Sequence, residues 1–461
     1  MKPIKLSFIV ASLAAAVLVQ ASEPIVAPSE AVVDDDRPYD PILNRTPEGI
    51  FISDTEWKVS GDIRAGWVDY DYSNSPNSSY DSSVNKGHKD SRGFYLIPKV
   101  SIESPVYNGF SGKITGAGVT DFGLNDPDYE TRTFALGTDN KSYAILQEAY
   151  LKYKDETNEV VVGAKEIVTP MIDADDWYLL ADTFQAAYYV NSYFENIKWG
   201  FAYFYKMAGP WDSGARDGSE EYASMSEASF VPDDIKDDAD DKGVYTGAFV
   251  YSVDHHNLQV WEYYAPDLYN TIFVQYDFTD TWDTLSYDLG AQLINFDDVG
   301  SMKDYEDGSI GYTIYSARFD GNFENGFDFA TGASFYTDGD GTQYTLGAWG
   351  GYPYFANGMI FHFFEAGSLR NANSYKAQVG YDLGQLGAEG LWVGTRFTYF
   401  DLDDEYSKTA TGESQDSMQM LGLRASYRND NGAYLTVTYE AVDLDNEPDI
   451  SGFRFIGGFT F

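Results

Sequence analysis

The chain has 461 residues, including 38 Tyr, 30 Phe, 9 Trp and 43 Gly, yet its mean hydropathy is only −0.36. Thirty Lys and Arg against 73 Asp and Glu give a net charge of −43, which excludes nucleic acid as a partner and favours attraction of cations. The chain has no cysteine, which excludes a disulfide framework, and beyond residue 21 no apolar run reaches the length of a membrane-spanning helix.

The first 56 residues are predicted to lie outside the folded domain. Lys2 and Lys5 precede an apolar run that ends at Val19, and small residues near Ala21 provide a cleavage site. Residues 1–21 are therefore predicted to be a secretory signal peptide. Residues 22–56 are acidic and contain five prolines, which predicts a flexible periplasmic extension without a core of its own.

From residue 57 onward, apolar and polar residues alternate in runs of about ten, and this period of two predicts strands. The eighteen runs are 57–71, 92–106, 110–123, 143–155, 159–167, 183–193, 196–206, 243–253, 257–265, 271–278, 285–296, 310–319, 325–337, 373–383, 390–401, 417–429, 433–442 and 452–461. An even number returns the chain to the same side of a membrane, as in bacterial single-chain barrels.

The last run and the connections favour a barrel in a membrane. In 452–461, Phe453, Phe455 and Phe459 share one face, which predicts a closing strand whose aromatic side contacts lipid. Short connections alternate with long inserts, as expected for periplasmic turns and outer loops. The predicted fold class is thus an all-β transmembrane antiparallel β-barrel over residues 57–461. The alternative is an extra hairpin within 342–366, which would give twenty strands.

Charged residues in the strands fall on the face opposite the apolar one, and are predicted to face the lumen. Nine basic residues form a predicted pore-lining basic wall, continuous once the last strand pairs with the first: Arg64, Lys99, Lys152, Lys165, Lys376, Arg396, Arg424, Arg428 and Arg454. The opposite acidic wall carries Asp277, Asp288 and Asp328. Lipid alone forces such charges inward, at about 2–4 kcal/mol for Lys and Arg at the midplane. Their clustering predicts a field across the lumen that steers charged solutes.

Two aromatic and acidic inserts, 168–182 and 338–372, are predicted to fold into the barrel, because such aromatics would promote aggregation if exposed. The predicted constriction residues are Asp173, Asp175, Asp176, Trp177, Tyr178, Tyr352, Tyr354, Phe355 and His362. The acidic insert 207–242 could gather divalent cations weakly, although its spacing matches no EF-hand and a solvated loop is the favoured interpretation.

Catalysis and cofactors are not expected. His88 lies in a loop insert and His255 and His256 lie in a tight turn, while His362 lies in the long insert without a nearby pattern of serine and acid. No glycine-rich phosphate loop or cysteine ligand occurs. No metal centre is predicted.

Four stretches resemble the OprD-type outer-membrane porins: KVSGDIRAGWVDYDYS (58–73), YAILQEAYLKYKDETNEVVVGAKEIVTP (143–170), ADTFQAAYYVNS (181–192) and SYKAQVGYDLGQLGAEGLWVGTRFTYFD (374–401). The resemblance implies an eighteen-strand barrel whose third and seventh outer loops, here 168–182 and 338–372, constrict the pore. It also implies a lumenal ladder of basic residues that guides carboxylates, with Lys376 and Arg396 in the matched stretch. The third loop departs from the family, because Asp175 and Asp176 stand where members often place an arginine, which weakens anion preference.

The predicted function is passive diffusion of small hydrophilic solutes and ions across the outer membrane. The alternatives are a substrate-specific channel for amino acids or carboxylates and, in another class, a surface protein or adhesin that uses the barrel as an anchor. Outer-membrane lipid and lipopolysaccharide are the expected surroundings. A homotrimer is one expected assembly, although nothing in the strands marks a subunit interface.

Overall fold

The computed structural model of the chain describes residues 56–71, 90–126, 135–137, 141–174, 176, 179–208, 222–227, 231, 233–239, 242–304, 310–341, 351, 353–361, 368–407, 414–445 and 449–461. The predicted signal peptide, and all but the last residue of the predicted extension, lie outside this part. Of the described residues, none belongs to a helix long and apolar enough to cross a membrane.

Eighteen long strands dominate the described chain. They are β1 (Lys58–Asp71), β2 (Asp90–Glu103), β3 (Phe110–Val119), β4 (Tyr143–Lys154), β5 (Asn158–Lys165), β6 (Thr183–Asn191), β7 (Ile197–Ala208), β9 (Val244–Val253), β10 (His256–Ala265), β11 (Tyr269–Trp282), β12 (Leu285–Asp298), β13 (Ile310–Phe323), β14 (Phe327–Tyr336), β16 (Asn373–Asp382), β17 (Leu391–Asp401), β18 (Ser417–Arg428), β19 (Ala433–Leu444) and β20 (Ile450–Thr460). The short elements are β8 (Tyr222–Ala223), β15 (Asp340–Gly341), α3 (Lys236–Ala239) and the 3-10 turns Met225–Glu227, Asp233–Ile235, Gly300–Asp304 and Leu383–Leu386.

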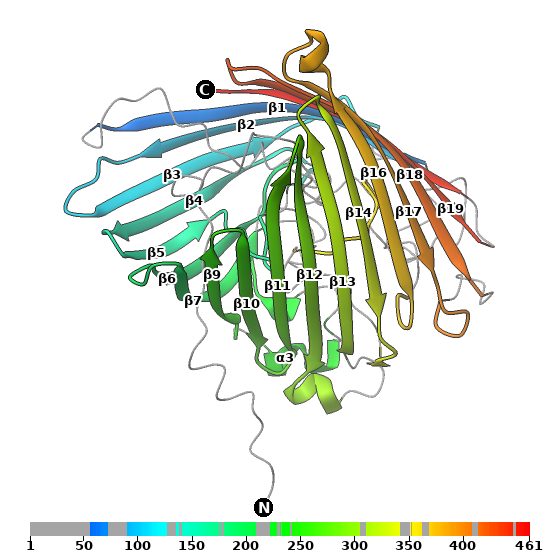
Figure 1. Ribbon diagram of the computed structural model, residues 1–461. Helices are drawn as coiled ribbons and strands as arrows, with labels where there is room; N and C mark the ends of the chain where they lie inside the picture. The colour runs from blue at the N-terminus through cyan, green and yellow to red at the C-terminus, as the bar shows by residue number, and fades with distance from the viewer. Residues whose placement is uncertain are drawn as a thin grey trace, which may run out of the picture.

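The sheet closes on itself. β1 pairs antiparallel with β2 and also with β20, where Trp67 lies opposite Phe455. Figure 1 shows the strands following one another around the barrel, with the C-terminal end beside β1. The predicted barrel of eighteen antiparallel strands is confirmed. The alternative of twenty is wrong, because β8 and β15 only flank β7 and β13, and residues 353–361 contain no strand.

Side chains alternate between the two faces of each strand, as the period of two predicts. On β10, Tyr263 is 0% exposed whereas Tyr264 is 42% exposed. On β20, Arg454 is buried while Phe455 and Phe459 are exposed. The outer face of the barrel is therefore largely apolar, and charged side chains gather on the inner face.

The connection between β2 and β3 is a tight hairpin turn. Asn108 and Gly109 both have positive φ values, 50° and 85°. Asn and Gly tolerate this left-handed region, which matches the twist of two paired strands. Short turns of this kind place the inward side chains of neighbouring strands in a fixed register.

Candidate functional site

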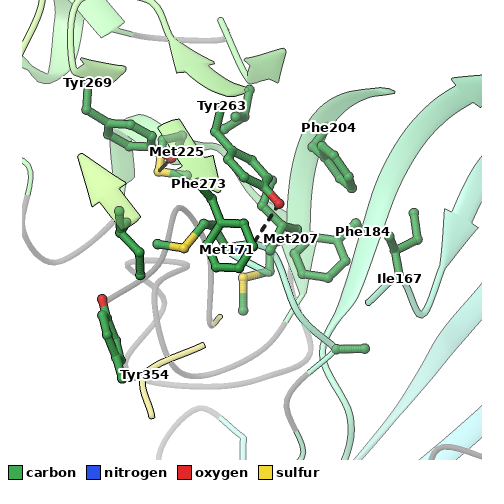
Figure 2. Packing of buried hydrophobic residues seen from close by; sticks show 14 of the residues in the cluster. Ile167, Met171, Phe184, Phe204, Met207, Met225, Tyr263, Tyr269, Phe273 and Tyr354 are labelled. Carbon is green, nitrogen blue, oxygen red and sulfur yellow. Dashed lines mark hydrogen bonds between the residues drawn. The ribbon is translucent and has the colours of Figure 1, made fainter. Parts of the chain in front are cut away.

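One segment inside the barrel comes from the connection between β5 and β6, at residues 166–182. The hydroxyl of Tyr263 on β10 accepts a hydrogen bond from the Met171 backbone N–H at 3.3 Å and donates one to the Thr169 hydroxyl at 3.0 Å. Figure 2 shows the Tyr263 ring directed at Met171. At the other end, Arg64 on β1 donates to the Leu179 carbonyl at 2.8 Å. This third-loop segment is thus attached to two separate parts of the barrel.

Asp176 strengthens the attachment to β1. Its carboxylate lies 2.7 Å from the Arg64 guanidinium, and both side chains are buried. Burial raises the pKa of Asp176 to about 6, although the neighbouring Arg64 charge opposes this rise. Asp173 of the predicted constriction is also buried. The predicted residues Asp175, Trp177 and Tyr178 lie outside the described residues.

A second inward segment, residues 353–361, belongs to the connection between β14 and β16. We refer to it as the crossing segment. Its carbonyls accept hydrogen bonds from inward side chains. The carbonyl of Pro353 accepts one from Gln292 on β12 at 2.7 Å, and farther along the wall that of Asn357 accepts one from Thr398 on β17 at 2.8 Å. The segment therefore follows the wall in strand order.

Its two ends are packed as closely as its middle. Phe361 meets Tyr70 of β1 edge to face, with ring centroids 5.8 Å apart. Near the start, the carbonyl of Phe355 lies 2.5 Å from where a Cβ on Gly332 would stand, so only glycine fits at that position of β14. Tyr354 is fully buried, and burial raises its pKa well above the usual value. The predicted residues Tyr352 and His362 lie outside the described residues.

Glu440 on β19 is the strongest anchor of the crossing segment. Its carboxylate accepts hydrogen bonds from three consecutive backbone N–H groups, those of Met359 at 2.7 Å, Ile360 at 2.6 Å and Phe361 at 2.7 Å. Glu440 is 0% exposed. Hydrogen bonds to a charged acceptor are the stronger kind, so a single inward side chain holds this turn of the segment.

The predicted basic residues on β2 to β5 face inward, opposite exposed apolar neighbours. Lys165 is buried, and its ammonium donates to the Glu166 carbonyl at 3.1 Å and lies 5.7 Å from the centre of the Tyr150 ring. Lys113 on β3 is buried and faces inward as well. Ion pairs join Lys99 to Glu166, Lys113 to Glu148 at 2.6 Å and Lys152 to Glu103 at 3.8 Å. This part of the basic wall carries matching carboxylates.

Two predicted arginines contact the crossing segment directly. Arg396 donates to the Asn357 side-chain oxygen at 3.2 Å and to the Gly358 carbonyl at 3.3 Å. Arg424 donates to the Met359 carbonyl at 3.4 Å. These guanidiniums are thus part of the attachment of the loop as well as of the wall.

The remaining three basic positions differ in their surroundings. Lys376 on β16 and Arg454 on β20 are buried, and Arg454 donates to the Tyr70 hydroxyl at 2.7 Å. Arg428 is the last residue of β18 and is half-buried. The structure thus brings most of the predicted basic residues onto one inner surface, with Arg428 at its rim.

The predicted acidic wall is organised around an arginine that the sequence patterns did not single out. Arg318 on β13 lies 3.0 Å from Asp277 and 3.1 Å from Asp288. The third predicted residue, Asp328, instead accepts a hydrogen bond from the Trp392 indole at 2.7 Å. Two of the three carboxylates therefore share one cation.

The alternation within β13 carried the signal for Arg318. Ala317 and Phe319 are exposed on the outer face, so the residue between them must face inward. Arg318 also lies over the Phe355 ring, with 4.9 Å between the guanidinium carbon and the ring centre. It connects the acidic wall to the crossing segment.

No cluster of three or more His, Asp or Glu side chains able to hold a metal is found among the described residues. Much of the acidic insert 207–242 lies outside those residues, so the predicted weak cation binding stays a prediction.

Comparison with known proteins finds similarity at the level of structure. No protein-family profile and no curated protein sequence matches the chain. OccK9 (OpdG) of Pseudomonas aeruginosa superposes with a TM-score of 0.71 at 14% identity, covering 88% of this chain and 98% of that one. OpdK of the same organism, determined with vanillate, gives 0.70 at 13%, and OccAB4 of Acinetobacter baumannii gives 0.68 at 14%, both with the same coverage.

These solved structures are porins of the OprD and Occ type, and the chain has their fold. The resemblance predicted from the four sequence stretches is thereby confirmed for the fold. At such low identity, similarity establishes the architecture alone.

Proposed function

We propose that the chain is an outer-membrane porin, exported through a cleaved signal peptide, which lets small hydrophilic solutes and ions diffuse through a water-filled pore. The fold shared with OprD-type and Occ-type porins supports an outer-membrane channel of this kind. An apolar outer face and a charged inner face also suit a barrel surrounded by lipid and lipopolysaccharide.

The observation that carries the proposal is the attachment of two loop segments inside one closed barrel. The third-loop segment is held by Arg64 and Tyr263, and the crossing segment is held by strands from β12 to β1. Segments placed in this way would narrow the path and leave its lining polar. Passage would then depend on the size and charge of the solute, with no chemical step.

The direct test is conductance in planar lipid bilayers. The purified chain without residues 1–21 should insert and give stepwise current increases, whereas the same preparation unfolded by heat should give none. Insertion without any conductance would refute the channel and favour the alternative of a barrel that anchors a surface protein.

A loop replacement tests the constriction. Replacing residues 353–361 with a Gly-Ser linker of equal length should raise the size of the single-channel step, because the anchors on the wall would lose their partners. An equal replacement of residues 233–239, in the connection between β7 and β9, is the matched control and should leave the step unchanged. A step of unaltered size in the first variant would place the constriction elsewhere.

A second candidate is a channel specific for small carboxylates. It is favoured by the inward guanidiniums of Arg396 and Arg424 beside the crossing segment, and by the vanillate in the OpdK structure. The net charge of −43 and the acidic third loop favour cations instead. Reversal potentials in a salt gradient should therefore show cation preference for the general porin. Anion preference, together with current block by millimolar vanillate, would support the carboxylate channel.

A further inference from the structure

Glu262 stands on the outer face of the barrel, where its neighbours are apolar. On β10, the flanking residues Trp261 and Tyr263 are buried inside, so the side chain of Glu262 points outward. In the register of the sheet it lies beside Gly247 of β9 and Ile272 of β11. Along its own strand, the outward positions on either side are Val260 and Tyr264. The carboxylate therefore lies within the apolar surface, one outward position below an exposed tyrosine.

The described residues offer this carboxylate no hydrogen bond and no salt bridge. A carboxylate facing lipid is costly, and charged residues on that face are usually confined to the rims. A second polar group lies next to it, because Asn270 of β11 pairs with Tyr264 and points outward as well. The Asn270 side-chain oxygen is buried, and the described residues give it no hydrogen-bond partner. Two polar groups on this patch thus lack the contacts that buried or lipid-facing groups require.

A complementary charge occurs a short way around the same face. At the β6–β7 pairing a bulge places Lys206 opposite Gln185, both on the outer face. The ammonium of Lys206 lies 5.4 Å from the Tyr205 ring centre, and it forms no salt bridge within the described part of the chain. β7 is two strands from β10 in the sheet, so Lys206 and Glu262 belong to one patch without contacting each other.

We propose that the outer face of β6, β7, β9 and β10 is the interface between copies of this chain, and that Glu262 of one copy pairs with Lys206 of the next. Such contacts are heterologous, and they close into a ring when the angle between the two patches fits. Eighteen strands share a full turn, so each takes up about 20° and the two patches lie about 40° apart. In a ring of three round barrels, the two contacts that each barrel makes lie about 60° apart around it. An interface several strands wide accommodates the difference between about 40° and about 60°.

Cysteine pairs test this arrangement, because the chain has no cysteine of its own. The double variant Glu262→Cys with Lys206→Cys, oxidised in the outer membrane, should give covalent dimers and trimers on a denaturing gel. Co-expressed single variants should give dimers only, and each single variant alone should stay monomeric. Val379→Cys with Leu421→Cys, exposed and also two strands apart on the far side of the barrel, is the matched control and should give no ladder.

Charge exchange supplies an independent readout. Sedimentation in mild detergent should show a trimer for the unaltered chain and a shift to monomer for Glu262→Lys. The exchange Glu262→Lys with Lys206→Glu should restore the trimer, and heat-modifiable migration on gels checks that every variant is folded. Monomeric unaltered protein, or cross-linking of Glu262→Cys to itself, would overturn the proposal. Neither readout depends on conductance, so the interface can fail while the channel stands.

Discussion

Glu440 offers the sharpest test of how the crossing segment is held. The substitution Glu440→Gln keeps the length of the side chain but removes its charge and one acceptor oxygen. Three backbone N–H groups, at 2.6 to 2.7 Å, then face a side chain that presents one oxygen and one amide donor. At least one of the three N–H groups loses its acceptor.

The magnitude follows from the number and kind of these bonds. A hydrogen bond to a charged group contributes roughly 1.5–3 kcal/mol, and a buried donor without an acceptor costs roughly 1–3 kcal/mol. The change should therefore weaken the attachment of the segment by about 3 kcal/mol. Since about 1.4 kcal/mol corresponds to a tenfold change in an equilibrium constant, the detached state should become about a hundred times more populated.

Hydrogen exchange and conductance measure that population separately. Amide exchange in the peptide covering residues 353–361 should accelerate by about two orders of magnitude, and single-channel recordings should show larger or flickering steps. Glu103→Gln is the matched control, because Glu103 also faces inward but, in the described part of the chain, its one ion pair is with Lys152 at 3.8 Å. Equal exchange rates in Glu440→Gln and the unaltered chain would refute the anchoring role of this carboxylate.

Three further predictions concern charge and close packing. Burial raises the pKa of Asp176 from its ordinary 3.8 to about 6, so the folded protein holds this proton more tightly than the unfolded chain does. The stability of the unaltered chain relative to Asp176→Asn should therefore fall as the pH rises from about 4 to 6. Thermal unfolding measured across that range would show no such fall if Asp176 titrates normally. Arg318→Gln should shift the reversal potential toward cations because two carboxylates lose their shared partner, whereas Arg92→Gln, on the outer face of β2 beside Asp69, should not; equal shifts would contradict a local effect. Gly332→Ala should increase conductance by displacing the crossing segment, while Gly116→Ala, whose Cβ would meet nothing within 4 Å, should match the unaltered chain in the same bilayer assay.

The barrel was predictable because its determinants are local. Alternation sets which face each residue takes, and the long and short connections set the direction of each strand. Strand ends were less visible. The run predicted at 271–278 extends in the structure over Tyr269–Trp282, since polar residues such as Thr281 still pair in register, here with Ser286. Polar pairs beyond the apolar band have no hydrophobic period and were missed for that reason.

The inner contacts were only partly predictable. That the long seventh loop enters the barrel was inferred from its aromatic content, and the burial of Tyr354 and Phe355 agrees with this. The order in which this loop contacts the strands could not be predicted, because no sequence period sets the register between a loop and the barrel wall. Alternation along β19 is enough to place the carboxylate of Glu440 inside, but its three backbone donors come from residues about eighty positions away.

The charges of the wall act in two ways at once, and this changes how selectivity should be understood. Arg64 binds Asp176 of the third-loop segment, and Arg396 binds the crossing segment, so both hold loops in place. A wall residue with a loop partner contributes to the field of the lumen only together with that partner. Lys152 pairs with the carboxylate of Glu103 on the neighbouring part of the wall, and it has no such loop contact in the described chain. Substitution of an anchoring charge must therefore alter the width and the charge of the path together, whereas substitution of Lys152 alters the charge alone.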